Sequence, residues 1–167
     1  MSSSTPELTA AVITVSDSSS RGEREDLGGP AVVAALEKYN FHVIAQEIVP
    51  DEQTAIQDAL VRLCGQARFV VTTGGTGIAP RDVTPEATRT VIEREVPGIG
   101  EALRADSTAK TPHGLLSRGT AGIVGRTLVV NLPGSPGGCR DGYALLRPAL
   151  PHALELIAGE PTSHRQT

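Results

Sequence analysis

Short apolar runs alternate with segments of helical periodicity along most of this 167-residue chain. Runs rich in valine, isoleucine and threonine predict strands at 8–16, 41–49, 68–73 and two more within 120–134. The segments between them predict helices at 28–40, 50–65, 85–95 and 98–108, then two helices within 135–159 with a break near 148–151. Such alternation predicts an α/β fold: a three-layer sandwich with a mostly parallel central sheet and helices on both faces.

Two local signals refine this fold. Gly125 and Arg126 lie between two apolar runs, and a glycine that comes first in a two-residue turn suits a type II′ hairpin. We therefore expect at least one antiparallel strand in the sheet. At the 85–95 helix, we expect Thr84 to cap the N-terminus and Pro85 to take the first position.

The whole chain is expected to form one domain, residues 1–167, with a core at about 8–158 and short mobile tails. Its N-terminus has neither a basic segment nor a long apolar run, so we expect no signal peptide, no membrane span and a cytoplasmic location. A net charge of −4 and 2% aromatic residues argue against a nucleic-acid-binding protein. Cys64 and Cys139 form no CxxC pair and the four histidines are scattered, which predicts reduced thiols and no zinc site.

The segment "TTGGTGIAPRDVTPEA" at 72–87 places three glycines directly behind the 68–73 strand. In an open α/β sheet, ligands bind beyond the carboxyl ends of the strands, where this segment lies. Glycines there can adopt positive φ and let a ligand approach, while backbone amides and threonine hydroxyls can form an anion cradle. The candidate cradle comprises Thr73, Gly74, Gly75, Thr76 and Gly77.

The alternative for this segment is a tight strand–helix turn that binds nothing. Two familiar phosphate-binding motifs do not fit it. No Gly-Lys-Ser/Thr follows, as a Walker A loop requires, and Pro80 stands where GxGxxG needs its last glycine. The sequence therefore argues against P-loop kinases and dinucleotide-dependent dehydrogenases.

Two acidic residues follow predicted strands. Asp82 comes just after the glycines, and Asp51 follows the 41–49 strand, so both carboxylates reach one edge of the sheet if those strands are neighbours. Two carboxylates beside a phosphate site suit Mg²⁺, which is commonly shared between protein carboxylates and substrate phosphates. The alternatives are that Asp51 is a helix N-cap and that Asp82 pairs with Arg81.

Two further loops are expected at the same edge. In "NLPGSP" at 131–136, Gly134 and Ser135 could hold an anion at the following helix N-terminus, or form a plain turn. In "SDSSSRGERED", which follows the first strand, Arg21, Arg24 and Asp26 are either ligand contacts or solvated surface residues. Several loops that converge on one edge favour a binding site.

Three segments together resemble a known family: "SDSSSRGEREDLGGP", "TTGGTGIAPRDVTPEA" and "LSRGTAGIVGRTLVVNLPGSP". They are similar to the Mog/MoaB-type molybdopterin-binding family of molybdenum-cofactor biosynthesis, which is related to the G domain of gephyrin. The resemblance runs from about Leu8 to Ile157. It implies a three-layer α/β fold, a homotrimer and, for the active members, molybdopterin adenylyltransferase activity. Such enzymes join AMP from Mg-ATP to the terminal phosphate of molybdopterin and release pyrophosphate.

The resemblance also implies roles for matching positions. Asp51 and Asp82 match the two functional aspartates, which are expected to be catalytic and to hold Mg²⁺. Binding of the pterin and its phosphate is expected at Thr73, Gly74, Gly75, Thr76, Gly77, Pro133, Gly134, Ser135 and Pro136, and nucleotide binding at Ser16, Asp17 and Asp26. The attacking phosphate oxygen is already ionised at neutral pH, so no side-chain base is needed. The implied partners are molybdopterin, ATP and, as a candidate, a downstream molybdenum-insertion protein.

Two other functions stay open on the sequence alone. One is a non-catalytic molybdopterin carrier or scaffold, against which the presence of both aspartates counts. The other is a competence-damage-type enzyme that acts on a pyridine nucleotide or ADP-ribose. The single compact domain counts against this second alternative, because those proteins usually carry a partner domain.

Overall fold

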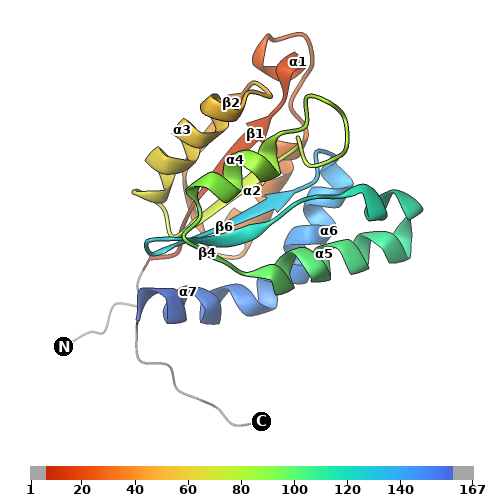
Figure 1. The fold of residues 1–167 in the computed structure, drawn as a ribbon. Helices are drawn as coiled ribbons and strands as arrows, with labels where there is room; N and C mark the ends of the chain where they lie inside the picture. The colour runs from red at the N-terminus through yellow and green to blue at the C-terminus, as the bar shows by residue number, and fades with distance from the viewer. Residues whose placement is uncertain (1–6, 160–167) are drawn as a thin grey trace, which may run out of the picture.

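A computed structural model describes residues 7–159 as a six-stranded sheet between two layers of helices (Figure 1). The strands are β1 (Thr9–Val15), β2 (His42–Val49), β3 (Phe69–Thr73), β4 (Arg94–Glu95), β5 (Ala121–Val124) and β6 (Thr127–Leu132). Their order is β2-β1-β3-β6-β5-β4, with β2, β1, β3 and β6 parallel and both β4–β5 and β5–β6 antiparallel. The predicted three-layer fold with a mostly parallel sheet is confirmed. The predicted tails fall almost entirely outside the described residues.

The helices are α1 (Asp17–Ser20), α2 (Gly28–Lys38), α3 (Gln53–Cys64), α4 (Thr84–Val91), α5 (Pro97–Lys110), α6 (Pro136–Leu146) and α7 (Leu150–Ala158). Two 3₁₀ turns, η1 (Pro112–Leu116) and η2 (Arg147–Ala149), complete the described elements. Helices α3 and α4 cover one face of the sheet, and α2, α5, α6 and α7 cover the other. No described helix is long and apolar enough to cross a membrane.

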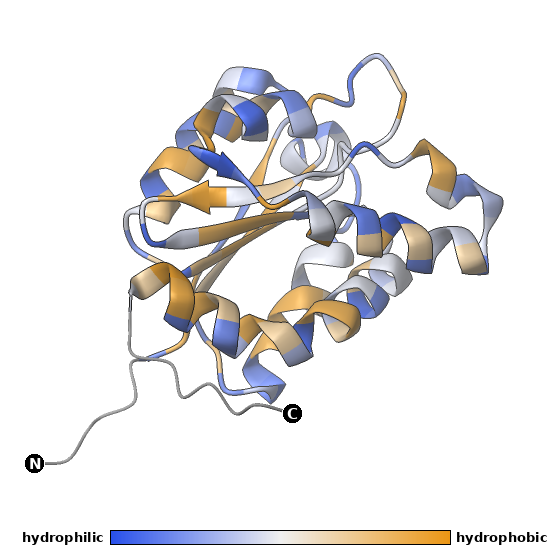
Figure 2. Cartoon of the chain, turned by 60° about the horizontal axis from the view of Figure 1, so that its bottom comes forward, coloured by the Kyte–Doolittle hydropathy of each residue, from blue (hydrophilic) through white to orange (hydrophobic). Residues whose placement is uncertain are grey.

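The two cores lie on opposite faces of the same strands. Along β1, Ala10 and Val12 pack towards α2, α6 and α7, whereas Ala11 and Ile13 pack towards α3 and α4. Successive side chains of a strand point to opposite faces, so one apolar run supplies both cores. Figure 2 shows the result: the central strands are hydrophobic, while the helices alternate between hydrophobic and hydrophilic residues.

The hairpin between β5 and β6 forms as predicted. Gly125 has a positive φ of 56°, while Arg126 does not lie in the positive-φ region. A positive φ at only the first turn residue is the mark of a type II′ turn, whereas type I′ needs it at both. The break predicted near 148–151 is also present, because η2 separates α6 from α7.

The predicted helix at 85–95 is wrong at both ends. It ends at Val91, after which Ile92 is extended and Arg94–Glu95 form β4. The backbone amide of Glu93 donates to Ile123 O (2.9 Å), so pairing with β5 replaces the last helical turn. At the other end Thr84 does not cap the helix, because its hydroxyl donates to Gly74 O (2.9 Å) instead.

The order of the strands places a crevice beyond the carboxyl ends of β1 and β3. The chain leaves β1 through α2 to reach β2 on one side, and then crosses through α3 to β3 on the other side. The two connecting helices lie on opposite faces of the sheet. The loop after β1 leads to α2 on one face and the loop after β3 leads to α4 on the other, so these two loops diverge. Open α/β sheets bind ligands at such a switch point.

Candidate active site

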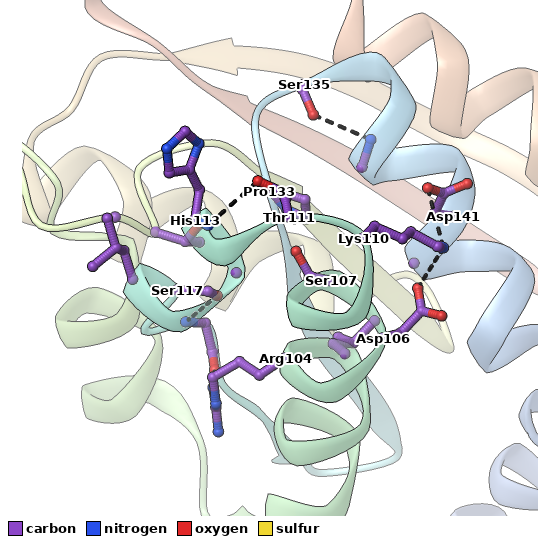
Figure 3. A pocket seen from close by; sticks show the side chains of 18 of the residues that line it. Arg104, Asp106, Ser107, Lys110, Thr111, His113, Ser117, Pro133, Ser135 and Asp141 are labelled. Atoms are coloured by element: carbon purple, nitrogen blue, oxygen red, sulfur yellow. Dashed lines mark hydrogen bonds and ion pairs between the residues drawn. The ribbon is translucent and has the colours of Figure 1, made fainter.

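Two cavities meet at the carboxyl edge of the sheet. The β1 cavity, of about 310 Å³, is lined by Thr14, Val15, Ser16, Ser19, Arg24, Glu25, Asp26, Leu27, Gly28, Thr73, Gly74, Gly134, Ser135 and Pro136. The α5 cavity, of about 450 Å³, is lined by α5, η1 and α6 (Figure 3). The glycine loop, Thr73–Gly77, contributes to both: Thr73 and Gly74 line the β1 cavity, and Thr76 and Gly77 line the α5 cavity. Ser135 also lines both cavities.

The glycine loop needs glycines because larger residues would clash with neighbouring atoms. Gly74 and Gly75 have positive φ values of 88° and 67°. A methyl group on Gly74 would overlap the carbonyl oxygen of Val15, and one on Gly75 would overlap the hydroxyl of Thr84. Gly77 does not have positive φ, but a methyl group there would stand 2.9 Å from Asp82 Oδ2. Close approach therefore explains all three glycines, and backbone conformation explains two.

The predicted anion cradle is only partly available. The amide of Gly74 donates to Leu132 O (3.2 Å), so the prediction that this group faces a ligand is wrong. The amides of Gly75, Thr76 and Gly77 have no acceptor within residues 7–159. Three consecutive free amides at the junction of two cavities can bind the oxygens of an anion.

Asp51 is held through its backbone and its side chain by Asp17. The amide of Asp17 donates to Asp51 Oδ2 (2.8 Å), and the amide of Asp51 donates to Asp17 Oδ1 (3.0 Å). Arg81 donates to both carboxylate oxygens of Asp17, each at 2.9 Å. Both structural alternatives are thereby excluded: Arg81 pairs with Asp17 rather than with Asp82, and the N-cap of α3 is Glu52 rather than Asp51.

Asp51 and Asp82 both approach the glycine loop, although neither lines either cavity and the strands before them are not neighbours. The prediction rested on adjacent strands, but β1 lies between β2 and β3. Asp51 Oδ1 lies 3.2 Å from the position that a Cβ of Gly75 would take, and Asp82 Oδ2 lies 2.9 Å from the corresponding position of Gly77, two residues later. Asp82 Oδ2 accepts from the amide of Ala79 (2.9 Å), which closes a tight turn.

The electrostatics of this site favour a cation. Burial raises the pKa of Asp51, and the negative charges of Asp17 and Asp82 raise it further, while the hydrogen bond from the Asp17 amide lowers it. In contrast, the hydrogen bonds from Arg81 hold the pKa of Asp17 below its ordinary value. The carboxylate of Asp51 is thus less stable than that of an exposed aspartate, and a nearby positive charge would offset this cost.

The donor set fits Mg²⁺ when it is shared with substrate phosphates. Asp51 Oδ1 and Asp82 Oδ1 accept no hydrogen bond from residues 7–159, so each acid keeps one free oxygen. The described part of the chain holds no cluster of three or more His, Cys, Asp or Glu that could bind a metal alone. Mg²⁺ commonly takes one or two carboxylates and completes its shell with phosphate oxygens and water.

Of the residues expected to bind the nucleotide, some line the β1 cavity and others do not. Ser16 and Asp26 line the β1 cavity, as does Arg24. Ser16 caps α1 by accepting from the amide of Ser19 (3.2 Å). Asp26 accepts from the hydroxyl of Thr14 (2.6 Å) and the amide of Gly29 (3.0 Å), so both of its oxygens already have protein partners. Arg21 pairs with exposed Glu23, and Asp17 lines neither cavity.

The 131–136 loop forms the wall between the cavities. Pro133 lines the α5 cavity, and Gly134 and Pro136 line the β1 cavity. Ser135 is the N-cap of α6, because its hydroxyl accepts from the amide of Gly138 (3.1 Å). The positive end of the α6 dipole therefore lies at this wall, where it favours bound anions.

Sequence reasoning missed the far wall of the α5 cavity. This wall is lined by Arg104, Ser107 and Lys110 of α5 and by His113 of η1 (Figure 3). Lys110 Nζ lies between Asp106 (2.7 Å) on its own helix and Asp141 (3.2 Å) on α6. The available signal was a spacing of three residues from 104 to 107 to 110, which puts these polar side chains on one helical face.

Comparisons with known proteins find relatives named for molybdopterin binding or biosynthesis. Residues 11–152 match a family described as "Probable molybdopterin binding domain". The molybdopterin adenylyltransferase of Helicobacter pylori (strain J99) is 43% identical over 155 residues, covering 89% of this chain and 86% of that protein. The molybdopterin biosynthesis enzyme MoaB from Thermus thermophilus superposes with a TM-score of 0.86 at 46% identity, covering 93% of this chain and 99% of that one. The Mog protein from Mycobacterium ulcerans gives 0.87 at 38% identity, covering 93% and 100%.

Proposed function

Because this chain belongs to the Mog/MoaB family of molybdopterin-binding domains, we propose that it is a molybdopterin adenylyltransferase. The proposed reaction transfers AMP from ATP to the terminal phosphate of molybdopterin and releases pyrophosphate. Relatives named for this activity in Helicobacter pylori and Haemophilus influenzae are 43% and 38% identical to the chain.

One observation carries the proposal: a single loop lines two cavities. A two-substrate transfer needs two binding sites that meet at the reacting atoms, and the glycine loop and Ser135 are shared in this way. The β1 cavity would take the nucleotide and the larger α5 cavity the pterin. The phosphates would then lie over the free amides of Gly75, Thr76 and Gly77, close to Asp51 and Asp82.

The residues at this junction suit a reaction between two anions. The nucleophile, a phosphate oxygen, needs no base, so the main barrier is repulsion between the phosphates. Backbone amides and the N-terminus of α6 lower that repulsion, and the two cavity walls fix the reactants in line. Asp51 and Asp82 would hold Mg²⁺, which when bound neutralises charge on the phosphates.

The test is a direct search for the product. Purified protein is incubated with molybdopterin, ATP and Mg²⁺, and adenylated pterin is sought by mass spectrometry. The wild type should form it. Asp82→Asn should lower the rate by at least about 100-fold, with the dissociation constant of molybdopterin changed less than about threefold. Asp58→Asn, on the exposed face of α3, is the matched control and should keep full activity.

Two results would count against the proposal. If the wild type forms no adenylated pterin, the proposed activity is wrong. If Asp82→Asn turns over at the wild-type rate, Asp82 has no part in the mechanism.

A non-catalytic molybdopterin carrier is the second candidate, because the matching family is described only by molybdopterin binding. Isothermal titration separates the two functions. A carrier would bind molybdopterin and show no heat with ATP and Mg²⁺, whereas the enzyme binds both ligands.

We also propose that the chain acts as a homotrimer. Ile78 and Leu115 are 66% and 72% exposed on the loop after β3 and on η1, which leaves apolar surface for a neighbouring subunit to cover. Sedimentation should give a mass of three times the 17.4 kDa chain, and a mass near one chain would contradict the trimer.

A further inference from the structure

The loop that carries Asp82 is fastened at both ends by one side chain, that of Arg118. Arg118 lies between η1 and β5, far from the loop in sequence. Its Nε donates to Gly77 O (2.7 Å) and its Nη2 donates to Asp82 O (2.8 Å). Its own backbone amide donates to Thr76 O (2.8 Å). One residue therefore holds the end of the glycine loop and the peptide of a proposed catalytic acid.

The guanidinium of Arg118 is itself fixed from the α4 side. Its Nη1 pairs with the carboxylate of Glu86, in the first turn of α4, and its Nη2 lies 3.4 Å from Glu86 Oε2. This pair holds the pKa of Glu86 below its ordinary value. The guanidinium is thus a rigid bridge between a packed helix and the loop.

The loop has few other restraints. Within the single chain, residues 78–81 are exposed, so they contribute little packing to their own subunit. Within the loop, the amide of Asp82 donates to Ala79 O (2.9 Å) and the amide of Ala79 donates back to Asp82 Oδ2 (2.9 Å). Arg81 links the loop to Asp17. These bonds shape the turn, and Thr84 at the start of α4 donates to Gly74 O (2.9 Å) and Gly75 O (3.1 Å). Arg118 is the side chain that bonds the carbonyls of both Gly77 and Asp82 and joins them to Glu86 of α4.

We propose that Arg118 is a positioning residue for adenylyl transfer, which sets the Asp82 carboxylate and the Gly77 amide at the glycine loop that the two cavities share. The inference rests on the proposed function. A lysine cannot replace it, because one ammonium cannot reach two carbonyls and a carboxylate in the planar fork that a guanidinium offers. A displacement of about 1 Å at a reacting centre can reduce the rate by about 100-fold.

The test compares Arg118→Lys with Arg62→Lys. Arg62 is a matched control, since it also forms a two-bond pair with a glutamate, Glu47 (2.6 and 2.8 Å), away from both cavities. In Arg118→Lys, kcat should fall about 10- to 100-fold while KM for each substrate changes less than about threefold. Arg62→Lys should keep the wild-type kcat. Adding guanidinium at millimolar concentration to Arg118→Ala should restore part of the lost kcat.

Amide hydrogen exchange provides a readout that needs no activity. Peptides that cover residues 76–84 should exchange at least about tenfold faster in Arg118→Lys, with the rest of the chain unchanged. If kcat and exchange both match the wild type, or if exchange rises over the whole chain together with the loss of activity, the inference is wrong. If the wild type transfers no AMP, the proposed function fails, and with it the role of Arg118 in that reaction. The exchange result then still decides whether Arg118 fixes the loop.

Discussion

Among single residues, Asp51 shows how a carboxylate that we propose to be catalytic can lower the stability of the fold that carries it. Burial and the charges of Asp17 and Asp82 raise its pKa, so the folded protein binds the proton more tightly than the unfolded chain does. The free energy of unfolding therefore falls as pH rises from the unfolded pKa of about 3.9 through the raised folded pKa. Asp51→Asn removes the charge but keeps an oxygen that can accept from the Asp17 amide.

We therefore predict that Asp51→Asn stabilises the protein at pH 7 while it removes activity. The expected gain in Tm is about 1–3 °C at pH 7. The gain should shrink as pH falls and should vanish below about pH 3.9, where Asp51 is protonated in both states. Calorimetry of both proteins between pH 3.5 and 8 measures it. A difference in Tm that is independent of pH, or a loss of stability at pH 7, would contradict this account of Asp51.

At the scale of elements, the glycine loop is tied directly to the end of β1. Gly74 has a φ of 88°, and a methyl group there would overlap the Val15 carbonyl, which is backbone and cannot rotate away. Gly74→Ala should therefore lower the free energy of unfolding by at least about 2 kcal/mol in urea titrations. Gly98→Ala is the control, because nothing lies within 4 Å of its added methyl group and it lies in α5. It should be neutral or slightly stabilising, and equal effects of the two changes would remove the close-approach explanation.

Elements set by local periodicity were predictable, whereas those set by distant partners were not. The β1 strand, the α3 helix and the Gly125 turn follow from apolar spacing and turn chemistry within one segment. The two-residue β4 depends on β5, about 30 residues later, and its pairing overrides the helical pattern of 85–95. The candidate active site was likewise predictable only where the information lay within one segment. The motifs indicated Asp51 and Asp82, but the partner of Arg81 and the bridge from Arg118 depend on folding that brings distant loops together.

At the scale of the whole molecule, the site depends on both cores at once. The β1 cavity borders the start of α2, the far wall of the α5 cavity comes from α5 and α6, and Asp51 and Asp82 each lie two residues before a helix, α3 and α4. Helices α2, α5 and α6 pack on one face of the sheet and α3 and α4 on the other, and the central strands supply side chains to both cores. A disturbance on either face should therefore reach the other through β1, β3 and β6.

Matched truncations in the two cores test this coupling. Leu60 of α3 and Leu154 of α7 are both fully buried, one in each core. Each leucine-to-alanine change should lower the free energy of unfolding by about 2–5 kcal/mol, and each variant should still unfold in one cooperative transition.

Two probes can follow this unfolding. The chain has no tryptophan, so the probes are far-UV circular dichroism and the fluorescence of tyrosine, with Tyr143 buried beside α2. Both are followed at one fixed chain concentration, because assembly would shift the apparent stability. If the probes separate in Leu60→Ala, with the Tyr143 core surviving after the α3 core has melted, then the two faces are independent units and the sheet does not couple them.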